Sequence, residues 1–222
     1  MNESVPVLAI DGPSGSGKGT LAAWMATELG WHLLDSGALY RSVAAMAVRQ
    51  GLDVDAEPTM QALAESLDIA FLDGKVLVDG LDLTDEIRTE DIGVMASRVA
   101  ALPAVRGAIL QLQRNFAKAP GLVADGRDMG TVVFPHAGLK IFLDASAQAR
   151  AERRYNQLKN KGLSVSLRDL LEQIQERDAR DRERATAPLK PATDAMLIDS
   201  TQMTIQEAVS YTHQTLPTTL VV

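Results

Sequence analysis

The chain has 222 residues, 46% hydrophobic and 23% charged, a composition that predicts one folded globular domain and excludes a disordered chain. Its net charge of −7 argues against nucleic acid polymers as partners, since proteins that bind them present basic surfaces. With no cysteine, thiol catalysis, disulfides and cysteine-based zinc sites are excluded. Residues 1–6 lack a basic region and the apolar run 7–10 is short, so we expect a cytoplasmic protein with no membrane partner. We also expect a monomer.

The first part of the chain alternates short apolar runs with helical patterns. Residues 5–10 predict a strand buried on both faces, and residues 18–29 predict a helix ended by a glycine. Residues 32–34 predict a second buried strand, and residues 39–50 predict a second helix. This order of strands and helices is typical of an α/β fold with a parallel sheet.

A different pattern interrupts this alternation. Residues 69–83 contain two Asp-Gly pairs flanked by apolar residues, which predicts a small antiparallel meander. Helical patterns lie on either side of it, at 58–67 and 90–102. We therefore expect residues of about 56–92 to form an insertion on one face of a single domain that spans 1–222.

The second part of the chain returns to short apolar runs that each adjoin an aspartate. Three more strands are predicted there, at 122–124, 139–143 and 196–198. Residues 150–184 predict two helices broken near 161–162, and their dense charge indicates that they face solvent or ligand rather than the core. A capping box from Thr204 to Glu207 predicts a last helix, whereas residues 211–222 carry no charge and contain a proline.

The strongest motif is a glycine-rich loop between the first strand and the first helix, where a P-loop would lie. Its residues are Gly12, Pro13, Ser14, Gly15, Ser16, Gly17, Lys18, Gly19 and Thr20. Glycines allow backbone N–H groups to surround phosphate oxygens, and the helix N-terminus adds positive charge at the same point. Lys18 would reach the β- and γ-phosphates of ATP. The competing interpretation is an ordinary glycine-rich turn.

The loop departs from the common P-loop pattern at one position. Gly19 stands directly after Lys18, where a serine or threonine usually binds magnesium, and Thr20 follows one residue later. No direct protein ligand for the metal is therefore expected. Mg²⁺ would come with ATP and be held through ATP oxygens and water, in keeping with its reluctance to dehydrate.

Two polar segments follow predicted strands, on the side where ligands bind in open α/β sheets. Residues 35–41 contain Arg41 and residues 125–131 contain Arg127, and an arginine can grip a phosphate with two hydrogen bonds. The second segment, Asp-Gly-Arg-Asp, could instead be a simple polar turn.

The segment 176–184 is dense in both signs of charge. Arg177, Arg180 and Arg184 have helical spacing and fall on one face, which is typical either of a solvated helix or of a phosphate-binding one. Phosphoryl transfer needs positive charge around the migrating group. A helical lid is expected at about 150–165, and its candidate residues are Arg150, Arg153 and Arg154.

Taken together and in this order, the motifs resemble the bacterial cytidylate kinases from about residue 5 to residue 210. The segments that carry the resemblance are 11–20, 34–41, 125–131, 140–145 and 177–184. The resemblance implies a P-loop NTPase-type three-layer fold with a central parallel sheet, a small inserted acceptor-binding region with antiparallel strands, and a helical lid. It also implies transfer of the γ-phosphoryl group of ATP to CMP or dCMP.

The resemblance further implies roles for individual residues. Around the acceptor phosphate it places Ser36, Arg41, Arg127 and Arg177, with Asp181 at the sugar. At or beside the cytosine it places Ser97, Arg106, Asp128 and Arg184. Lys18, Arg127, Arg177 and Arg184 are the candidates for catalysis. A carboxylate such as Asp128 suits cytosine because it accepts from the exocyclic amine, where uracil presents a carbonyl.

Two other functions remain open at this point. The first is a kinase of the same fold with another acceptor, such as UMP, AMP or a small metabolite. The second is a regulatory module that binds nucleotide without transferring phosphate. Such a switch would be expected to use a direct serine or threonine ligand for magnesium, and Gly19 argues against it.

Overall fold

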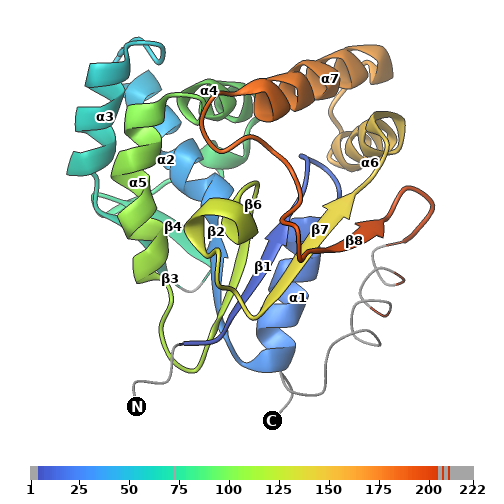
Figure 1. Cartoon of the computed structure of the whole chain (residues 1–222). Coiled ribbons are helices and arrows are strands. Elements are labelled where there is room, and N and C mark those ends of the chain that lie inside the picture. The colour runs from blue at the N-terminus through green and yellow to red at the C-terminus, as the bar shows by residue number, and fades with distance from the viewer. Residues whose placement is uncertain (1–4, 73, 205–206, 208–209, 211–222) are drawn as a thin grey trace. The chain divides into compact units, whose positions relative to one another are not determined.

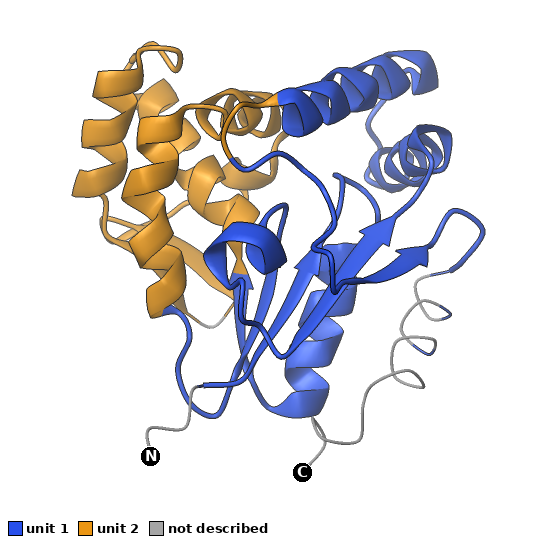
Figure 2. Cartoon of the chain, in the orientation of Figure 1, with its two compact units in different colours: residues 1–34, 116–183, 187–222 blue, residues 35–115, 184–186 orange. Residues whose placement is uncertain are grey.

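The structure is a computed structural model, and it describes residues 5–72, 74–204, 207 and 210 (Figure 1). The chain divides into two compact units, which are described separately below (Figure 2). Unit 1 comprises residues 1–34, 116–183 and 187–222, and unit 2 comprises residues 35–115 and 184–186.

A five-stranded sheet forms the centre of unit 1. Its strands are β1 (Val7–Asp11), β2 (His32–Asp35), β6 (Leu122–Gly126), β7 (Leu139–Asp144) and β8 (Met196–Asp199), in the spatial order β2-β6-β1-β7-β8. β1 pairs in parallel with β6 and with β7, and β7 pairs in parallel with β8. The expected α/β fold with a central parallel sheet is confirmed. Because chain order reverses on either side of β1, the loop after β1 lies at the switch point where such sheets bind ligands.

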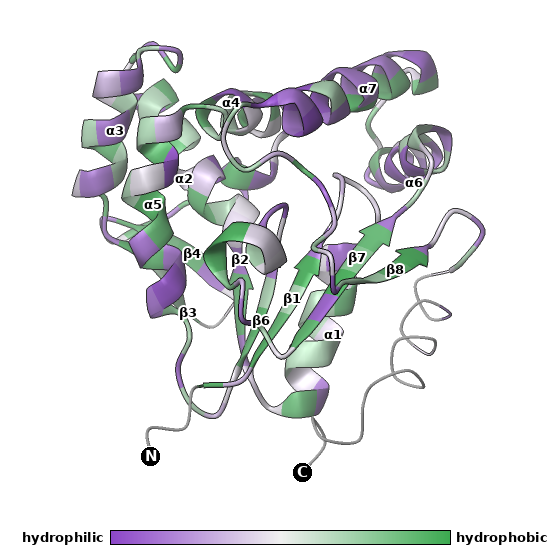
Figure 3. Cartoon of the chain, in the orientation of Figure 1, coloured by the Kyte–Doolittle hydropathy of each residue, from purple (hydrophilic) through white to green (hydrophobic). Residues whose placement is uncertain are grey.

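Burial distinguishes the central strands from the edge strand. Every residue of β1 and β6 is buried, as expected for strands covered on both faces, and Figure 3 shows their hydrophobic colouring. The expectation that residues 32–34 are buried is wrong for His32 and Leu33, and only Leu34 is buried in β2. The reason is topological, since β2 lies at the edge of the sheet.

The core of unit 1 lies between the sheet and helix α1 (Lys18–Leu29). Leu21 and Met25 of α1 pack with Leu8 and Ile10 of β1 and with strands on both sides of it. The helix ends at Gly30, whose φ of 63° is the left-handed conformation that favours glycine. The first strand and first helix are thus where the sequence predicts them, and they frame the glycine-rich loop.

Two charged helices also belong to unit 1: α6 (Ala147–Asn160) and α7 (Leu167–Glu183), which pack on each other. They confirm the prediction of two helices broken near residues 161–162. A five-residue π-helix, η2 (Met129–Val133), follows β6 and is an element that the sequence did not predict. Beyond β8, Thr204 and Glu207 make the reciprocal hydrogen bonds of the predicted capping box, whereas the tail 211–222 lies outside the described residues.

Unit 2 combines four helices with a small sheet. The helices are α2 (Ser36–Arg49), α3 (Glu57–Ser66), α4 (Glu90–Val99) and α5 (Pro103–Asn115), and α2 packs on α4 while α3 packs on α5. The predicted meander is present as antiparallel strands β3 (Ile69–Leu72), β4 (Lys75–Val78) and β5 (Leu81–Asp82), followed by a 3₁₀ turn, η1 (Glu86–Arg88). Asp73, in the first Asp-Gly pair, lies outside the described residues.

Helix α2 begins earlier than the apolar pattern predicts. It starts at Ser36 rather than near residue 39, because the Asp35 side chain caps it by accepting the N–H of Ala38 at 3.0 Å. The proposed insertion, 56–92, falls within unit 2, whose bounds are wider. Among the described residues no single helix is long and apolar enough to cross a bilayer; only α4 and α5 together, bent by 102°, meet the criteria of length and composition.

Candidate active site

The glycine-rich loop, residues 12–17, connects the end of β1 to the start of α1. Gly12, at φ 152°, touches β7 so closely that a Cβ there would lie 2.1 Å from the carbonyl oxygen of Leu143. Gly17 precedes the first turn of α1 with φ 97°. Only glycine fits these two positions without strain, and the loop therefore turns tightly into a helix N-terminus, the geometry that binds phosphate.

Lys18 lies against this loop rather than in solvent. The residue is buried, its ammonium donates to the carbonyl oxygen of Pro13 at 3.4 Å, and its Nζ is 3.6 Å from Oδ1 of Asp125 at the end of β6. The lysine charge is thus held beside the glycine-rich loop and the N-terminus of α1. Phosphates bound there would contact both the Lys18 ammonium and backbone N–H groups.

Asp125 also lies close to the backbone of Gly19. A Cβ at Gly19 would lie 3.2 Å from Oδ2 of Asp125, so a serine or threonine side chain would crowd this carboxylate. Within the described residues, no group of three or more His, Asp or Glu side chains could hold a metal ion directly. The donor set at this point is one carboxylate beside the phosphate loop.

Asp11, the last residue of β1, connects β1 to η2, the short helix that follows β6. Its Oδ1 accepts the N–H of Met129 at 2.7 Å and its Oδ2 accepts the N–H of Gly130 at 2.8 Å. Burial raises the pKa of Asp11 to about 7; the two N–H groups oppose this rise, and the negative charges of Asp128 and Asp125 add to it. A single carboxylate therefore holds the start of η2.

Arg127, between β6 and η2, pairs with α7. Its Nε donates to Oδ2 of Asp181 at 3.2 Å, and its Nη1 donates to the carbonyl oxygen of Gly126 at 3.1 Å. Both side chains are largely buried, at 17% and 6% exposed. The structure thus brings together Arg127 and Asp181, two residues expected at the acceptor. Arg177 lies one turn earlier on α7 and is half-buried.

Arg150 contradicts the expectation that the charges of 150–184 face solvent or ligand. It is only 2% exposed, and it donates to the carbonyl oxygens of Ala145 at 2.9 Å and Ser14 at 3.0 Å and to the carboxylate of Asp178. A guanidinium can be buried when its donors are satisfied in this way. Arg150 therefore connects the phosphate loop, α6 and α7.

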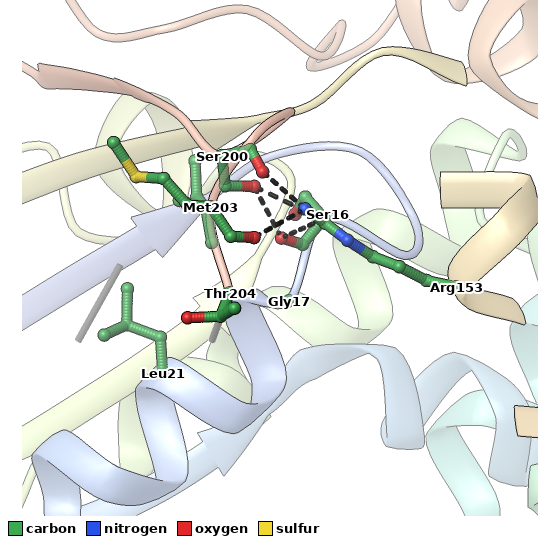
Figure 4. Close-up of a pocket in the computed structure, with 8 residues that line it drawn as sticks. Ser16, Gly17, Leu21, Arg153, Ser200, Met203 and Thr204 are labelled. Carbon is green, nitrogen blue, oxygen red and sulfur yellow. Dashed lines mark hydrogen bonds between the residues drawn. The ribbon is translucent and has the colours of Figure 1, made fainter. Parts of the chain in front are cut away.

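Arg153 contacts the loop that follows β8 (Figure 4). It donates to the carbonyl oxygen of Ser16 at 3.3 Å, to that of Met203 at 3.1 Å, and to that of Ser200. These residues line a pocket beside Gly17, together with Leu21 of α1. Arg154, the third candidate lid residue, donates to Gln157 at 3.3 Å, and partial burial lowers its pKa.

In unit 2, the candidate phosphate residues lie on α2. The hydroxyl of Ser36 is buried and accepts a hydrogen bond from Nε2 of Gln113 at 2.8 Å. Arg41 donates to the carbonyl oxygens of Ile87 at 2.7 Å and Thr89 at 3.2 Å. Its guanidinium passes so close to α4 that a Cβ at Gly93 would lie 2.8 Å from Nη2.

The candidate base residues of unit 2 are buried as well. Ser97 is 4% exposed on α4, and Arg106 is 7% exposed on α5. The Arg106 guanidinium lies 5.6 Å from the centre of the Tyr40 ring and donates to the carbonyl oxygen of Ala100 at 3.3 Å. Arg184 is half-buried, in the short segment of unit 2 that follows α7.

Sequence reasoning assigned no role to several residues that shape these contacts, namely Asp11, Gln113, Asp178 and Ser200. For Asp11 the sequence does hold a signal, because an acidic residue ends an otherwise apolar strand directly before the phosphate loop. Ser200 donates to the carbonyl oxygen of Ser16 at 3.1 Å across 184 residues, a pairing that no local pattern announces.

Comparisons with known proteins show which family the sequence resembles. The sequence model of a family described as "Cytidylate kinase" matches residues 8–217. A curated protein named cytidylate kinase from Pseudomonas aeruginosa is 60% identical over 215 residues, 94% of each chain. Those from Photobacterium profundum and Aeromonas hydrophila are 55% and 56% identical, over 97% and 93% of this chain and 98% and 92% of theirs.

Similarity among solved structures is weaker. A structure titled as a putative kinase from Chloroflexus aurantiacus aligns with 96% of this chain and 97% of its own. Its TM-score of 0.42 and identity of 16% are too low to bear on the fold.

Proposed function

The chain belongs to the cytidylate kinase family, and on that premise we propose how its own residues carry out the family's reaction. The reaction is ATP-dependent: the γ-phosphoryl group of ATP passes to CMP or dCMP, giving ADP and CDP or dCDP. A phosphate acceptor is already an anion, so no general base is needed, and catalysis rests on positioning and on stabilising the charge of the transferred group.

On the ATP side, the backbone of residues 12–17 and the Lys18 ammonium would hold the β- and γ-phosphates. The observation that supports this best is the place of Lys18, which lies buried against the Pro13 carbonyl at the N-terminus of α1. A cation held there by the fold needs little reorganisation as charge develops on the migrating group. Thr20 would add a hydroxyl at the same helix terminus.

Magnesium fits the site as a hydrated ion. Gly19 supplies no oxygen, and Asp125 lies beside it with a carboxylate that can accept hydrogen bonds from metal-bound water. Mg²⁺ brought by ATP would neutralise phosphate charge when bound. Asp125 would orient its water, and Lys18, 3.6 Å from Asp125, would keep the carboxylate in place.

On the acceptor side, the residues that would bind the phosphate of CMP are Arg127, Arg177, Ser36 and Arg41. Asp181 would accept from a sugar hydroxyl. Its pairing with Arg127 supports this, because the pair keeps both side chains ordered before the substrate arrives.

The base would be read by Ser97, Arg106 and Asp128, with Arg184 beside them. Arginine donors suit N3 and O2 of cytosine, and the Asp128 carboxylate suits its amine. The half-buried arginines Arg153 and Arg154, together with Arg150, would belong to a lid of about 150–165 that closes over ATP and excludes water. Arg150, which is buried, would connect this lid to the phosphate loop through its hydrogen bond to the Ser14 carbonyl oxygen.

We further propose that the enzyme acts in the cytoplasm as a monomer with no nucleic acid or membrane partner. The net charge of −7 supports the absence of a polyanionic partner. Light scattering after size-exclusion chromatography would test the oligomeric state.

The reaction is tested by measuring ADP release from ATP with CMP, dCMP, UMP and AMP as acceptors. CMP and dCMP should exceed the other acceptors by several powers of ten in kcat/KM. A ligand without the amine would leave the buried carboxylate of Asp128 without a hydrogen-bond donor, and such sites discriminate strongly. Preference for another monophosphate would indicate a same-fold kinase with a different acceptor. ATP binding without turnover on any acceptor would indicate a regulatory module.

A further inference from the structure

We propose that Asp11 is a positioning residue for the acceptor: through the backbone of Met129 and Gly130 it sets the orientation of Arg127 and Asp128. The inference rests on the proposed function, which places those two residues at CMP. It adds a role for a residue outside the phosphate loop and outside the acceptor set.

The first observation is the geometry of the contact. Each carboxylate oxygen of Asp11 accepts one backbone N–H, Oδ1 from Met129 at 2.7 Å and Oδ2 from Gly130 at 2.8 Å. Two successive N–H groups on one rigid carboxylate fix both the position and the rotation of this peptide segment. The segment begins directly after Asp128.

The second observation concerns the helix η2. The first N–H groups of a helix lack partners within it and require a cap. Asp128 occupies the N-cap position of η2, yet its side chain makes no capping hydrogen bond. Asp11 caps the helix instead, from another strand, so the carboxylate at the N-cap position is not used to hold its own helix.

The third observation is that burying the Asp11 carboxylate at this position costs free energy. It is 4% exposed at the end of a strand whose every residue is buried, and the carboxylates of Asp125 and Asp128 are near enough to disfavour its charge. A buried anion persists where its hydrogen bonds matter to the fold or the site. Here both bonds go to the segment that presents the proposed acceptor residues.

The fourth observation is the tight packing on the far side of the segment. A Cβ added to Gly130 would lie 3.1 Å from Cδ of Lys140 and 3.4 Å from Oδ2 of Asp11. The peptide between Met129 and Gly130 is therefore confined between β1 and β7. Asp11 also directly precedes Gly12, so one side chain joins the start of the phosphate loop to the acceptor segment.

The test compares two variants that disturb this contact from opposite sides, Asp11→Asn and Gly130→Ala. An asparagine keeps one acceptor oxygen but turns an NH₂ group toward a backbone N–H, so one hydrogen bond is lost and a donor is left unsatisfied. We expect KM for CMP to rise about 10-fold or more and the CMP/UMP ratio of kcat/KM to fall, while KM for ATP changes less than about 3-fold. Assays at pH 8 keep Asp11 ionised in the wild type.

The control is Glu172→Gln. It removes the same charge from an exposed carboxylate of unit 1, one that pairs with the Arg168 guanidinium at 3.0 Å, and it should leave both KM values unchanged. Equal changes in KM for ATP and CMP in Asp11→Asn would overturn the proposal, because they would place the effect in the phosphate loop. Unchanged CMP kinetics in both Asp11→Asn and Gly130→Ala would overturn it as well.

A second measurement needs no substrate and so separates this proposal from the proposed function. Amide hydrogen exchange of Met129 and Gly130 in the ligand-free protein should accelerate in Asp11→Asn and not in Glu172→Gln. Unchanged exchange at both amides would refute the capping role even if CMP is phosphorylated. If exchange is faster in Asp11→Asn but the wild type does not phosphorylate CMP, Asp11 is the cap of η2 and the assignment of this segment to the acceptor is wrong.

Discussion

Lys18 holds its positive charge against the phosphate loop, beside the Pro13 carbonyl and Asp125, and it is not part of the hydrophobic core cluster. Lys18→Ala should therefore leave the fold intact and lower kcat by about 10²–10³-fold or more, because one preorganised charge at the transferred phosphate is lost. The measurement is ADP release with CMP, alongside circular dichroism to confirm folding. Lys190→Ala, an exposed lysine outside the described contacts of the loop, serves as the control. A Lys18→Ala enzyme with near-normal kcat would remove the loop from the mechanism.

Asp128 is expected to decide between cytosine and uracil. Asp128→Ala should narrow the CMP/UMP ratio of kcat/KM, since it removes both the attraction to the cytosine amine and the repulsion of the uracil carbonyl. Both nucleotides should be measured on the wild type and on the folded variant. If the ratio stays constant, Asp128 does not read the base, and cytosine specificity must come from elsewhere.

The raised pKa of Asp11 predicts how stability depends on pH. Its folded pKa of about 7 lies above the ordinary 3.8, so its contribution to stability is fully present below about pH 4 and is lost as pH rises through 7. The unfolding free energy of the wild type relative to Asp11→Asn should fall by about 3 kcal/mol between pH 5 and pH 8. Urea denaturation of both proteins at the two pH values measures this. A difference that does not change with pH would show that Asp11 is ionised throughout.

Single residues differ in how well the sequence reveals them. Lys18 is found by motif because its neighbours in sequence are its neighbours in space. Asp11 bonds Met129 across 118 residues, and Arg150 bonds Ser14 across 136, so no local pattern predicts either contact. The dense charge of residues 150–184 predicts that Arg150 faces solvent or ligand, whereas its long-range partners allow its burial.

At the scale of elements, the packing of α6 on α7 depends on the buried pair Arg150–Asp178. Asp178→Asn should lower the unfolding free energy by about 3–5 kcal/mol, because it leaves a buried guanidinium without its counter-charge. The control is Glu172→Gln, which breaks the exposed pair with Arg168 on the same helix and should change stability by less than about 0.5 kcal/mol. Urea unfolding of the two variants provides the comparison. Equal losses of unfolding free energy would mean that the buried pair stabilises the protein no more than the exposed pair.

The same scale shows why some elements were predictable and others were not. The uniform apolar run of β1 and the glycine that ends α1 are local signals, and both elements form where expected. The exposure of β2 depends on its place at the edge of the sheet, which no window of residues contains. The first N–H groups of the π-helix η2 are bound by Asp11, a residue of strand β1 that lies 118 residues before Met129 in the sequence.

For the whole molecule, the order of motifs was sufficient to predict the fold class and the family, because four of the five segments that carry the resemblance lie at the ends of different strands of one sheet. The division into two units was not predictable to the same degree. Unit 2 gathers residues 35–115 with 184–186, and such grouping depends on contacts between distant segments rather than on composition.

The last prediction concerns ligand-linked stability of the whole chain. Ser97, Arg106 and Asp128 are among the residues proposed for CMP, and all three are buried in the folded chain. CMP should bind only the folded chain, so at 100 times its Kd it should stabilise the protein by about 2.7 kcal/mol. For a chain of this size that corresponds to a rise in Tm of about 5–11 °C. UMP at the same concentration should raise Tm far less, because Asp128 disfavours it.

Differential scanning calorimetry with CMP, UMP and no ligand measures the three midpoints, and Asp128→Ala should bring the two nucleotide shifts closer together. Equal shifts for CMP and UMP on the wild type would show that the folded chain does not distinguish the bases when it binds them, and any selectivity in turnover would then have to arise in the transition state.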